Sequence, residues 1–226
     1  MEDTLLQAAA LIPALIVAIV FHEVAHGWVA RALGDPTAHE RRRLSLNPLR
    51  HVDPMGTIVV PGMVALASLP VFGWAKPVPV DQRRLNNPRY GMMVVAAAGP
   101  VSNLLLAAVG AIVLGLIARW SGAGPVAEFL ALMFQGFIFI NISLALFNLL
   151  PIPPLDGSHI VEGLLPLRAA RAYAKLRRFG FALLLLLLVV VPYIWPSLGL
   201  VRRFVMPPVL WTAGQYFGLA QAVAGG

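Results

Sequence analysis

Long apolar segments separated by short polar loops dominate the sequence. A helix needs about 20 mostly apolar residues to cross the hydrocarbon core of a bilayer, and four segments reach that length: 4–33, 91–119, 126–150 and 179–200. A further apolar segment, 206–224, opens with two prolines and carries Gly214 and Gly218 at the GxxxG spacing of closely packed membrane helices. It is either another span or a helix lying in the interface. The pattern predicts an all-α polytopic membrane protein with about four to six transmembrane helices.

The segment 55–75 is long enough to span a bilayer, but helix breakers interrupt it. Its glycines and prolines are Gly56, Pro61, Gly62, Pro70 and Gly73. Such a density of breakers disfavours a continuous helix, and non-helical backbone at membrane depth is tolerated only where protein or a water-filled cavity covers it. We therefore expect a small membrane-embedded element here, a re-entrant segment or β-hairpin that enters the bilayer and returns.

The composition agrees with a membrane protein. Of the 226 residues, 59% are hydrophobic and 12% charged, whereas soluble domains carry about 25% charged residues. An ordinary soluble domain is thereby excluded, and we expect residues 1–226 to form one domain, with a catalytic core over about 4–165 and C-terminal helices over about 179–224. The chain has no cysteine, so any metal must be held by His, Asp, Glu or backbone oxygen ligands.

The net charge of +7 comes from basic residues in loops beside the apolar segments. All but three of the 17 Lys and Arg residues fall within 31–50, 76–89 and 168–178. This placement fits contact with an anionic lipid leaflet, so we expect no nucleic-acid partner. If 55–75 enters and returns, all three clusters lie on one face, which the positive-inside rule makes cytoplasmic. The acidic start of the chain then lies outside, and the first apolar segment, which is too long for a signal peptide, remains as a membrane helix.

Three ionisable side chains, His22, Glu23 and His26, interrupt the first apolar segment and form the motif HExxH. A charge at membrane depth costs about 2.5–3.5 kcal/mol on insertion scales, so it indicates function. Residues i and i+4 share a helix face, and both imidazoles can therefore reach one Zn²⁺ at about 2.0–2.1 Å. The glutamate between them is placed to act as a general base on water.

A catalytic zinc site needs a third protein ligand, and Asp156 is the leading candidate. It lies in FNLLPIPPLDGSH, just after the segment 126–150, where prolines block a regular helix. His26 is five residues from the basic Arg31, so both motifs lie near the same face of the bilayer. Glu128 is a weaker candidate because this topology places it at the opposite end of its span. Taken alone, Asp156 would more often be a turn residue that caps a helix end, and it is the unfinished HExxH site at the same depth that favours a ligand.

These motifs together resemble the site-2 protease family of intramembrane zinc metalloproteases. HEVAH lies in the first apolar segment and PPLDG follows a later one; NPLRHVDPMG, with His51 and Asp53, resembles the family's segment after the catalytic helix. Gly99–Asn103 (GPVSN) resembles its GPxxN element, and Asn148 fits its NxxPxxPLDG pattern. The resemblance covers roughly residues 15–165, and no segment resembles the PDZ or CBS-like domains that some members carry.

The resemblance implies that His22, His26 and Asp156 hold one zinc ion per chain and that Glu23 activates water to attack a peptide bond. The substrate would be a locally unwound transmembrane segment of a membrane protein or peptide, cut near the cytoplasmic face of a prokaryotic plasma membrane. The 55–75 segment would present an edge to it by strand addition. Asn148, and with less support Asn103, would stabilise the oxyanion or hold the substrate.

Several polar residues keep more than one interpretation. Asn103 and Asn148 could instead make interhelical hydrogen bonds, as such residues commonly do in bilayers. His51 and Asp53 could support the site, bind substrate or pack structurally near it. His159, three residues beyond Asp156, could be an alternative or inhibitory ligand. His39, beside Glu40 and three arginines, is expected to be a solvated loop residue.

The rival to an enzyme is a non-enzymatic membrane metal-binding protein, either a zinc transporter or a degenerate protease that binds substrates. A transporter is expected to place ionisable residues along a path through the bilayer. Here they gather at one depth, with an intact glutamate between the histidines, which favours the enzyme. A purely structural scaffold leaves the three intramembrane ionisable residues unexplained. The sequence does not specify the oligomeric state.

Overall fold

The computed structural model describes residues 2–59, 63, 75–120, 122, 124–199 and 201–225. The apolar runs form long helices because a helix satisfies its own backbone hydrogen bonds where lipid offers none. By length and composition, three helices of the described part can cross a membrane: α1 (Glu2–Ala32), α4 (Pro88–Trp120) and α5 (Pro125–Asn148). They coincide with the expected spans 4–33, 91–119 and 126–150, and that part of the prediction is confirmed.

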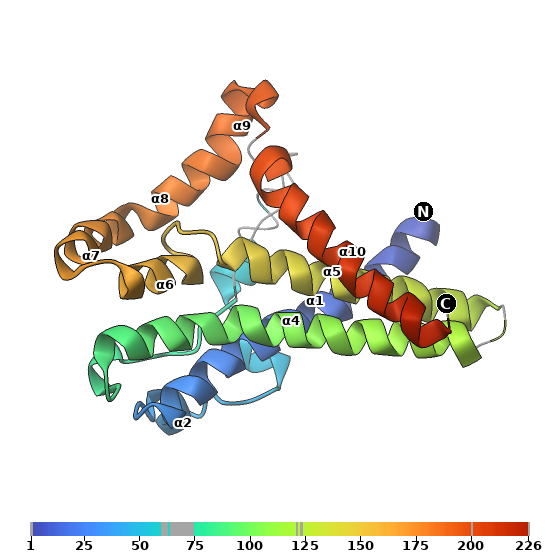
Figure 1. Ribbon diagram of the computed structural model, residues 1–226, viewed down its shortest axis with the longest axis horizontal. Helices are drawn as coiled ribbons and strands as arrows, with labels where there is room; N and C mark the ends of the chain where they lie inside the picture. Colours follow the sequence, from blue (N-terminus) through green and yellow to red (C-terminus); the bar gives the residue numbers. More distant parts are fainter. Residues whose placement is uncertain are drawn as a thin grey trace.

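The central helix of the bundle is α4, which packs against α1, α5 and α10 (Met206–Ala224), while α1 also packs against α5 (Figure 1). Small residues allow these close approaches. A β-carbon at Gly115 on α4 would lie 2.5 Å from the carbonyl oxygen of Ala220 on α10, and one at Gly136 on α5 would lie 2.1 Å from Leu11 Cδ2 on α1. The largest buried apolar cluster joins α4, α5 and α10: Ala107, Ala111, Leu114, Ile138, Ile142, Val209, Ala213 and Ala220.

The region after α5 is helical but irregular, and its longest stretch runs from Gly180 to Ile194. The expected span 179–200 is divided into α-helical, π-helical and 3-10 turns, which lie beside the main bundle and project from it (Figure 1). Pro192, which lacks a backbone N–H, follows the π-helical turn Leu186–Val190, and the helix ends at Ile194, before Pro196. The elements are α6 (Asp156–Leu164), α7 (Leu167–Ala174), η4 (Lys175–Phe179), α8 (Gly180–Leu185), η5 (Leu186–Val190), α9 (Val191–Ile194), η6 (Pro196–Leu198) and η7 (Val201–Val205).

The loop between α1 and α4 begins with short turns. It contains α2 (Thr37–Glu40), η1 (Pro48–His51), the π-helical turn η2 (Pro54–Val59) and η3 (Gln82–Arg84). No strand occurs within the described residues. Most of the expected membrane-embedded hairpin, 60–74 apart from residue 63, lies outside them, so the hairpin and the count of four to six spans stay predictions.

Candidate metal centre

The two histidines of the HExxH motif lie one turn apart on α1 and face the same carboxylate. His22 Nε2 is 3.1 Å and His26 Nε2 is 3.4 Å from Asp156 Oδ2. His22, His26 and Asp156 thus bring three ligand atoms within 4.8 Å of one another. Ligands of a tetrahedral zinc ion at about 2.0–2.1 Å lie about 3.3–3.4 Å apart. The separations from Asp156 Oδ2 therefore match a zinc site.

The outer nitrogens of both imidazoles are bonded to acceptors, which fixes the ring tautomers. Asn103 donates both of its amide hydrogens, to Ala18 O at 3.1 Å and to Asn141 Oδ1 at 2.8 Å, so its own oxygen faces His22 Nδ1 at 2.6 Å and accepts from it. His26 Nδ1 lies 2.7 Å from the carbonyl oxygen of Val95. Each ring therefore carries its proton on Nδ1 and presents the lone pair of Nε2 to the site.

Three lone-pair atoms facing one another with no proton between them repel unless a cation lies among them. Asp156 Oδ2 is buried, and no donor among the described residues reaches it in hydrogen-bond geometry. A buried carboxylate oxygen without a donor is costly. The donor set of His22, His26 and Asp156 therefore fits Zn²⁺, which prefers nitrogen and carboxylate ligands in this number.

The chain delivers Asp156 to α1 through the proline-rich turn after α5. Asp156 is the first residue of α6, and Gly157 lies so close to the end of α5 that a β-carbon there would be 2.2 Å from Leu149 O. Tyr173 OH donates to Pro151 O at 2.7 Å and Ser158 Oγ donates to Leu155 O at 2.7 Å, which hold the turn and the start of α6. The backbone that carries Asp156 is thus held in place next to α1.

Close packing against the two histidines explains why the GPVSN segment has a glycine at position 99. A β-carbon at Gly99 on α4 would lie 2.5 Å from His26 Nε2 and 2.6 Å from His22 Cε1. Pro100, which follows it within the helix, has no N–H to donate to the carbonyl one turn earlier. Gly99 therefore lets α4 approach the imidazoles directly, and Asn103, one turn on, reaches the back of His22.

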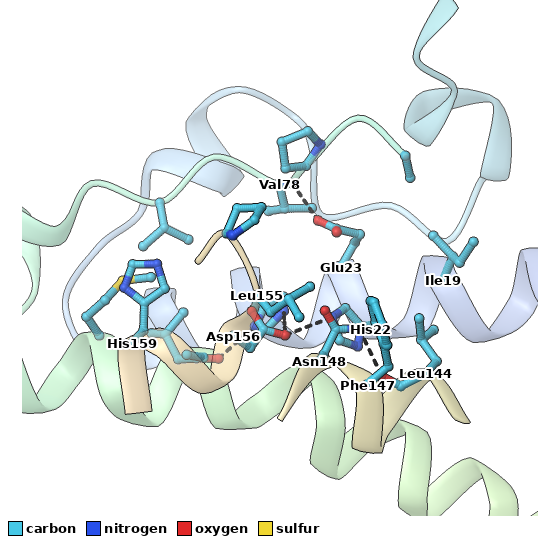
Figure 2. A pocket seen from close by; sticks show the side chains of 18 of the residues that line it. Ile19, His22, Glu23, Val78, Leu144, Phe147, Asn148, Leu155, Asp156 and His159 are labelled. Carbon is cyan, nitrogen blue, oxygen red and sulfur yellow. Dashed lines mark hydrogen bonds and ion pairs between the residues drawn. The ribbon is translucent and has the colours of Figure 1, made fainter. Parts of the chain in front are cut away.

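Next to the three ligands lies a cavity of about 880 Å³ that also contains Glu23, Asn148 and His159. Figure 2 shows Glu23 on one side, pointing toward Val78, with Asn148 beside His22 and Asp156. Most of the lining is apolar, with Ile19, Met92, Val95, Leu144, Phe147, Leu155, Phe181 and Leu184 among the residues. The cavity can therefore receive apolar side chains next to the metal ligands.

Two polar residues of the cavity have defined hydrogen-bonding states. One N–H of the Asn148 amide donates to Leu144 O at 2.9 Å, and an amide has a second N–H to offer. Arg177 donates to His159 Nδ1 at 3.3 Å, so neutral His159 carries its proton on Nε2. Burial, together with the positive charge of Arg177, lowers the pKa of His159 to about 4, which keeps the ring neutral at physiological pH.

Asn103 occupies a different place from the one its predicted catalytic role requires. It is fully buried behind His22 and does not line the cavity. Its contacts agree with interhelical hydrogen bonding that also orients a ligand. Asn141, its partner on α5, was missed by the sequence analysis. The available signal was a second asparagine on the same apolar span, seven residues before Asn148 and hence on the same helix face.

The other polar residues singled out in the sequence lie outside the cavity. His51 is buried, with Nε2 2.7 Å from Ser45 O, and Asp53 Oδ1 accepts from Gly56 N at 2.7 Å, so both hold the loop after α2. His39 is exposed beside Arg31, and Glu128 is exposed at the start of α5. Neither His39 nor Glu128 belongs to the metal-ligating group.

Replacing Asn103 by Leu should weaken zinc binding by about 10- to 100-fold, the usual effect of removing a group that orients a metal-bound histidine. Without its acceptor, His22 can rotate or change tautomer. Zinc affinity is measured by competition with a chelator. Ser102→Ala on the same helix, whose hydroxyl donates to Gly99 O, is the control and should keep wild-type affinity. Equal affinities in wild type and Asn103→Leu would contradict the orienting role.

A helical membrane bundle holding His, His and Asp around a cavity with an adjacent glutamate defines a metal-dependent hydrolase. The model of Peptidase family M50, the site-2 protease family, matches residues 10–190. This chain belongs to that family, and it is a multi-pass membrane zinc metalloprotease.

Curated bacterial relatives agree with this assignment. "Putative zinc metalloprotease YwhC" of Bacillus subtilis is 41% identical over 203 residues, which cover 87% of this chain and 89% of the relative. "Putative zinc metalloprotease Rip2" of Mycolicibacterium smegmatis is 32% identical over 174 residues, which cover 77% of this chain and 64% of the relative. The Rip2 protein of Mycobacterium tuberculosis is 31% identical over 173 residues. No solved structure gives a significant match.

Proposed function

We propose that this protein is an intramembrane endopeptidase, which hydrolyses a peptide bond within or beside a transmembrane segment of its substrate. One observation carries the proposal. His22, His26 and Asp156 come together at a largely apolar cavity that Glu23 also lines, and helices of membrane-spanning length surround it. A protease acting only on soluble peptides would have no need to place this site within an apolar bundle.

In the proposed reaction, His22, His26 and Asp156 hold the zinc ion. Zinc bound there supplies Lewis-acid polarisation of the scissile carbonyl and of water. Glu23 accepts a proton from the attacking water on its free carboxylate oxygen and returns it to the leaving amine. Asn148 offers the second N–H of its amide to the developing oxyanion or to a neighbouring substrate carbonyl.

The substrate must lose its helical structure where it is cut. In a helix every interior carbonyl accepts a hydrogen bond from the N–H four residues on, which leaves it shielded from attack. The apolar cavity favours a segment with apolar side chains, as a transmembrane helix supplies. The 55–75 segment, with its helix breakers, is proposed to take up the unwound strand by edge pairing.

We place the site near the cytoplasmic face of a bacterial plasma membrane, with the N-terminus outside. The three basic clusters support this orientation through the positive-inside rule. His26 lies five residues before Arg31, the first residue of those clusters, so water from the cytoplasmic side has a short path to the metal. The relatives from Bacillus and from mycobacteria support a prokaryotic membrane.

The purified protein, reconstituted with a single-span membrane substrate, should cut that substrate within or beside its span. Chelation of zinc should stop the cleavage, and added Zn²⁺ should restore it. Cleavage sites are mapped by mass spectrometry of both fragments. Zinc flux into the same proteoliposomes without any cleavage would overturn the protease and favour the transporter.

A further inference from the structure

A short irregular segment, residues 75–81 (AKPVPVD), crosses the wall of the cavity, and we call it the strap. Ala75, Pro77, Val78 and Val80 of the strap line the cavity. Prolines flank Val78 on both sides, and a proline has no backbone N–H. The N–H of Val78 is therefore an isolated donor in this part of the backbone.

That donor is directed at the glutamate of the HExxH motif. Val78 N–H donates to Glu23 Oε2 at 2.7 Å, across 55 positions of the sequence (Figure 2). A backbone N–H bonded to a carboxylate is a charge-assisted hydrogen bond, roughly twice as strong as a neutral one. It fixes one oxygen of Glu23 and leaves the other, Oε1, for a second partner.

The strap is anchored on either side of Val78, so the donor has a fixed position. Arg43 donates to Lys76 O at 2.9 Å, and Asp81 N–H donates to Asp35 Oδ2 at 2.7 Å. Asp35 is fully buried and also accepts from the backbone and the hydroxyl of Thr37. Burial alone would raise the pKa of Asp35, but hydrogen bonds from Thr37 and Asp81 outweigh it and hold the pKa below its usual range. This anchor is therefore ionised at neutral pH.

Gly27 explains how the strap comes so close to α1. It lies one turn after Glu23 on the same helix face. A β-carbon at Gly27 would lie 2.8 Å from Val78 Cγ1 and 2.5 Å from Leu44 Cδ2. Glycine at this position lets the strap approach α1 to within hydrogen-bond distance of Glu23. The seven residues FHEVAHG therefore carry two i, i+4 pairs: the histidines for the metal, and Glu23 with Gly27 for the strap.

We infer that Val78 is a positioning residue for the catalytic base: its backbone N–H holds Glu23 Oε2, so that Oε1 is directed to the attacking water. The inference rests on the proposed function, in which Glu23 is that base. It adds that the geometry of the base is set by a loop segment and not by α1 alone. A nucleophile or base oriented by a third group is a recurring arrangement in enzymes.

The direct test deletes the N–H with Val78→Pro. Val80→Pro is the comparison, because it also lengthens a proline run in the strap, to two prolines where Val78→Pro gives three, but removes an N–H that makes no hydrogen bond to Glu23. We expect Val78→Pro to lower kcat by about 10- to 100-fold, the effect of a misplaced catalytic group. KM and the zinc content should stay close to wild type. The loss in kcat should exceed that of Val80→Pro at least about tenfold. Val78→Ala, which keeps the N–H, should retain most of the wild-type kcat.

A second series tests the same contact without a new proline. Gly27→Ala should push the strap away from α1 and lower kcat while zinc remains bound. With Leu44→Ala in the background to remove the other close contact, adding Val78→Ala removes the crowding Cγ1 atom and keeps the N–H, so this triple variant should regain activity relative to Gly27→Ala, Leu44→Ala. This series decides the question if Val78→Pro does not fold.

Equal losses of kcat in Val78→Pro and Val80→Pro would overturn the positioning role. So would no gain in the Gly27→Ala, Leu44→Ala, Val78→Ala triple variant over Gly27→Ala, Leu44→Ala. Glu23→Gln, measured in parallel, separates this outcome from failure of the proposed function. If Glu23→Gln is inactive while Val78→Pro keeps wild-type kcat, only the inference about the strap fails. If Glu23→Gln stays active, the assigned base fails, and the inference fails with it.

Discussion

Replacing Glu23 by Gln should abolish cleavage of a membrane substrate while zinc stays bound. The amide keeps the size of the side chain but cannot accept a proton from water, and losing a general base typically costs about 10²- to 10⁴-fold in rate. The metal ligands His22, His26 and Asp156 are untouched by the change. The measurements are the rate of fragment formation in proteoliposomes and zinc per chain by elemental analysis.

The matched control is Glu128→Gln, the same substitution at an exposed position at the start of α5, outside the cavity. It should leave both the cleavage rate and the zinc content at wild-type values. Zinc-dependent cleavage at the wild-type rate in Glu23→Gln would remove Glu23 from the mechanism. Loss of zinc in that variant would instead show that the glutamate helps to hold the metal.

The parts of the structure that were predictable from sequence depend on local periodicity. Long, mostly apolar runs specify α1, α4 and α5, because a membrane leaves a helix as the favoured structure for such a run. The spacing of His22 and His26 places them on one helix face, and the need for a third ligand selects Asp156 from the few acidic residues. These predictions agree with the geometry because each rests on an i, i+4 rule or on a ligand count.

The parts that were not predictable depend on which segments meet in space. Nothing in the sequence indicated that Asn103 lies behind His22, where it is hydrogen-bonded to Asn141; it was expected to contact the substrate. The Val78–Glu23 bond was equally hidden, because a backbone N–H has no signature in the sequence. The expected span 179–200 is helical from Gly180 to Ile194, with a π-helical turn before Pro192, and whether it crosses the membrane stays a prediction.

The structure also shows why a charged motif is tolerated within the apolar bundle. Each ionisable side chain of HExxH makes one hydrogen bond: His22 to Asn103, His26 to Val95 O, and Glu23 to Val78 N–H. These bonds offset the cost of removing the groups from water. Asp156 Oδ2, by contrast, has no donor in the described part of the chain. The metal-ligating atoms are thus left without protein partners, while the groups around them are satisfied.

Replacing Asp156 by Ala should reduce zinc affinity by more than about 100-fold, beyond the 10- to 100-fold expected for a group that only orients a ligand. Two imidazoles remain, and a catalytic zinc site needs three protein ligands. Cleavage should be lost together with the metal. Zinc per chain after equilibration at a fixed chelator concentration is the measurement. Glu162→Ala, an acidic residue of the same helix outside the ligand group, should keep one zinc ion per chain.

His159 gives this experiment a second use, because it lines the same cavity three residues beyond Asp156. To supply a nitrogen to the metal, its neutral ring would have to release the hydrogen bond from Arg177 to Nδ1 or move its proton from Nε2 to Nδ1. The double variant Asp156→Ala, His159→Ala separates the two ligands. If the single variant Asp156→Ala already loses zinc, the third ligand position belongs to the aspartate. Zinc kept in that variant and lost only in the double variant assigns it to His159, and zinc kept in both removes both residues from the ligand set.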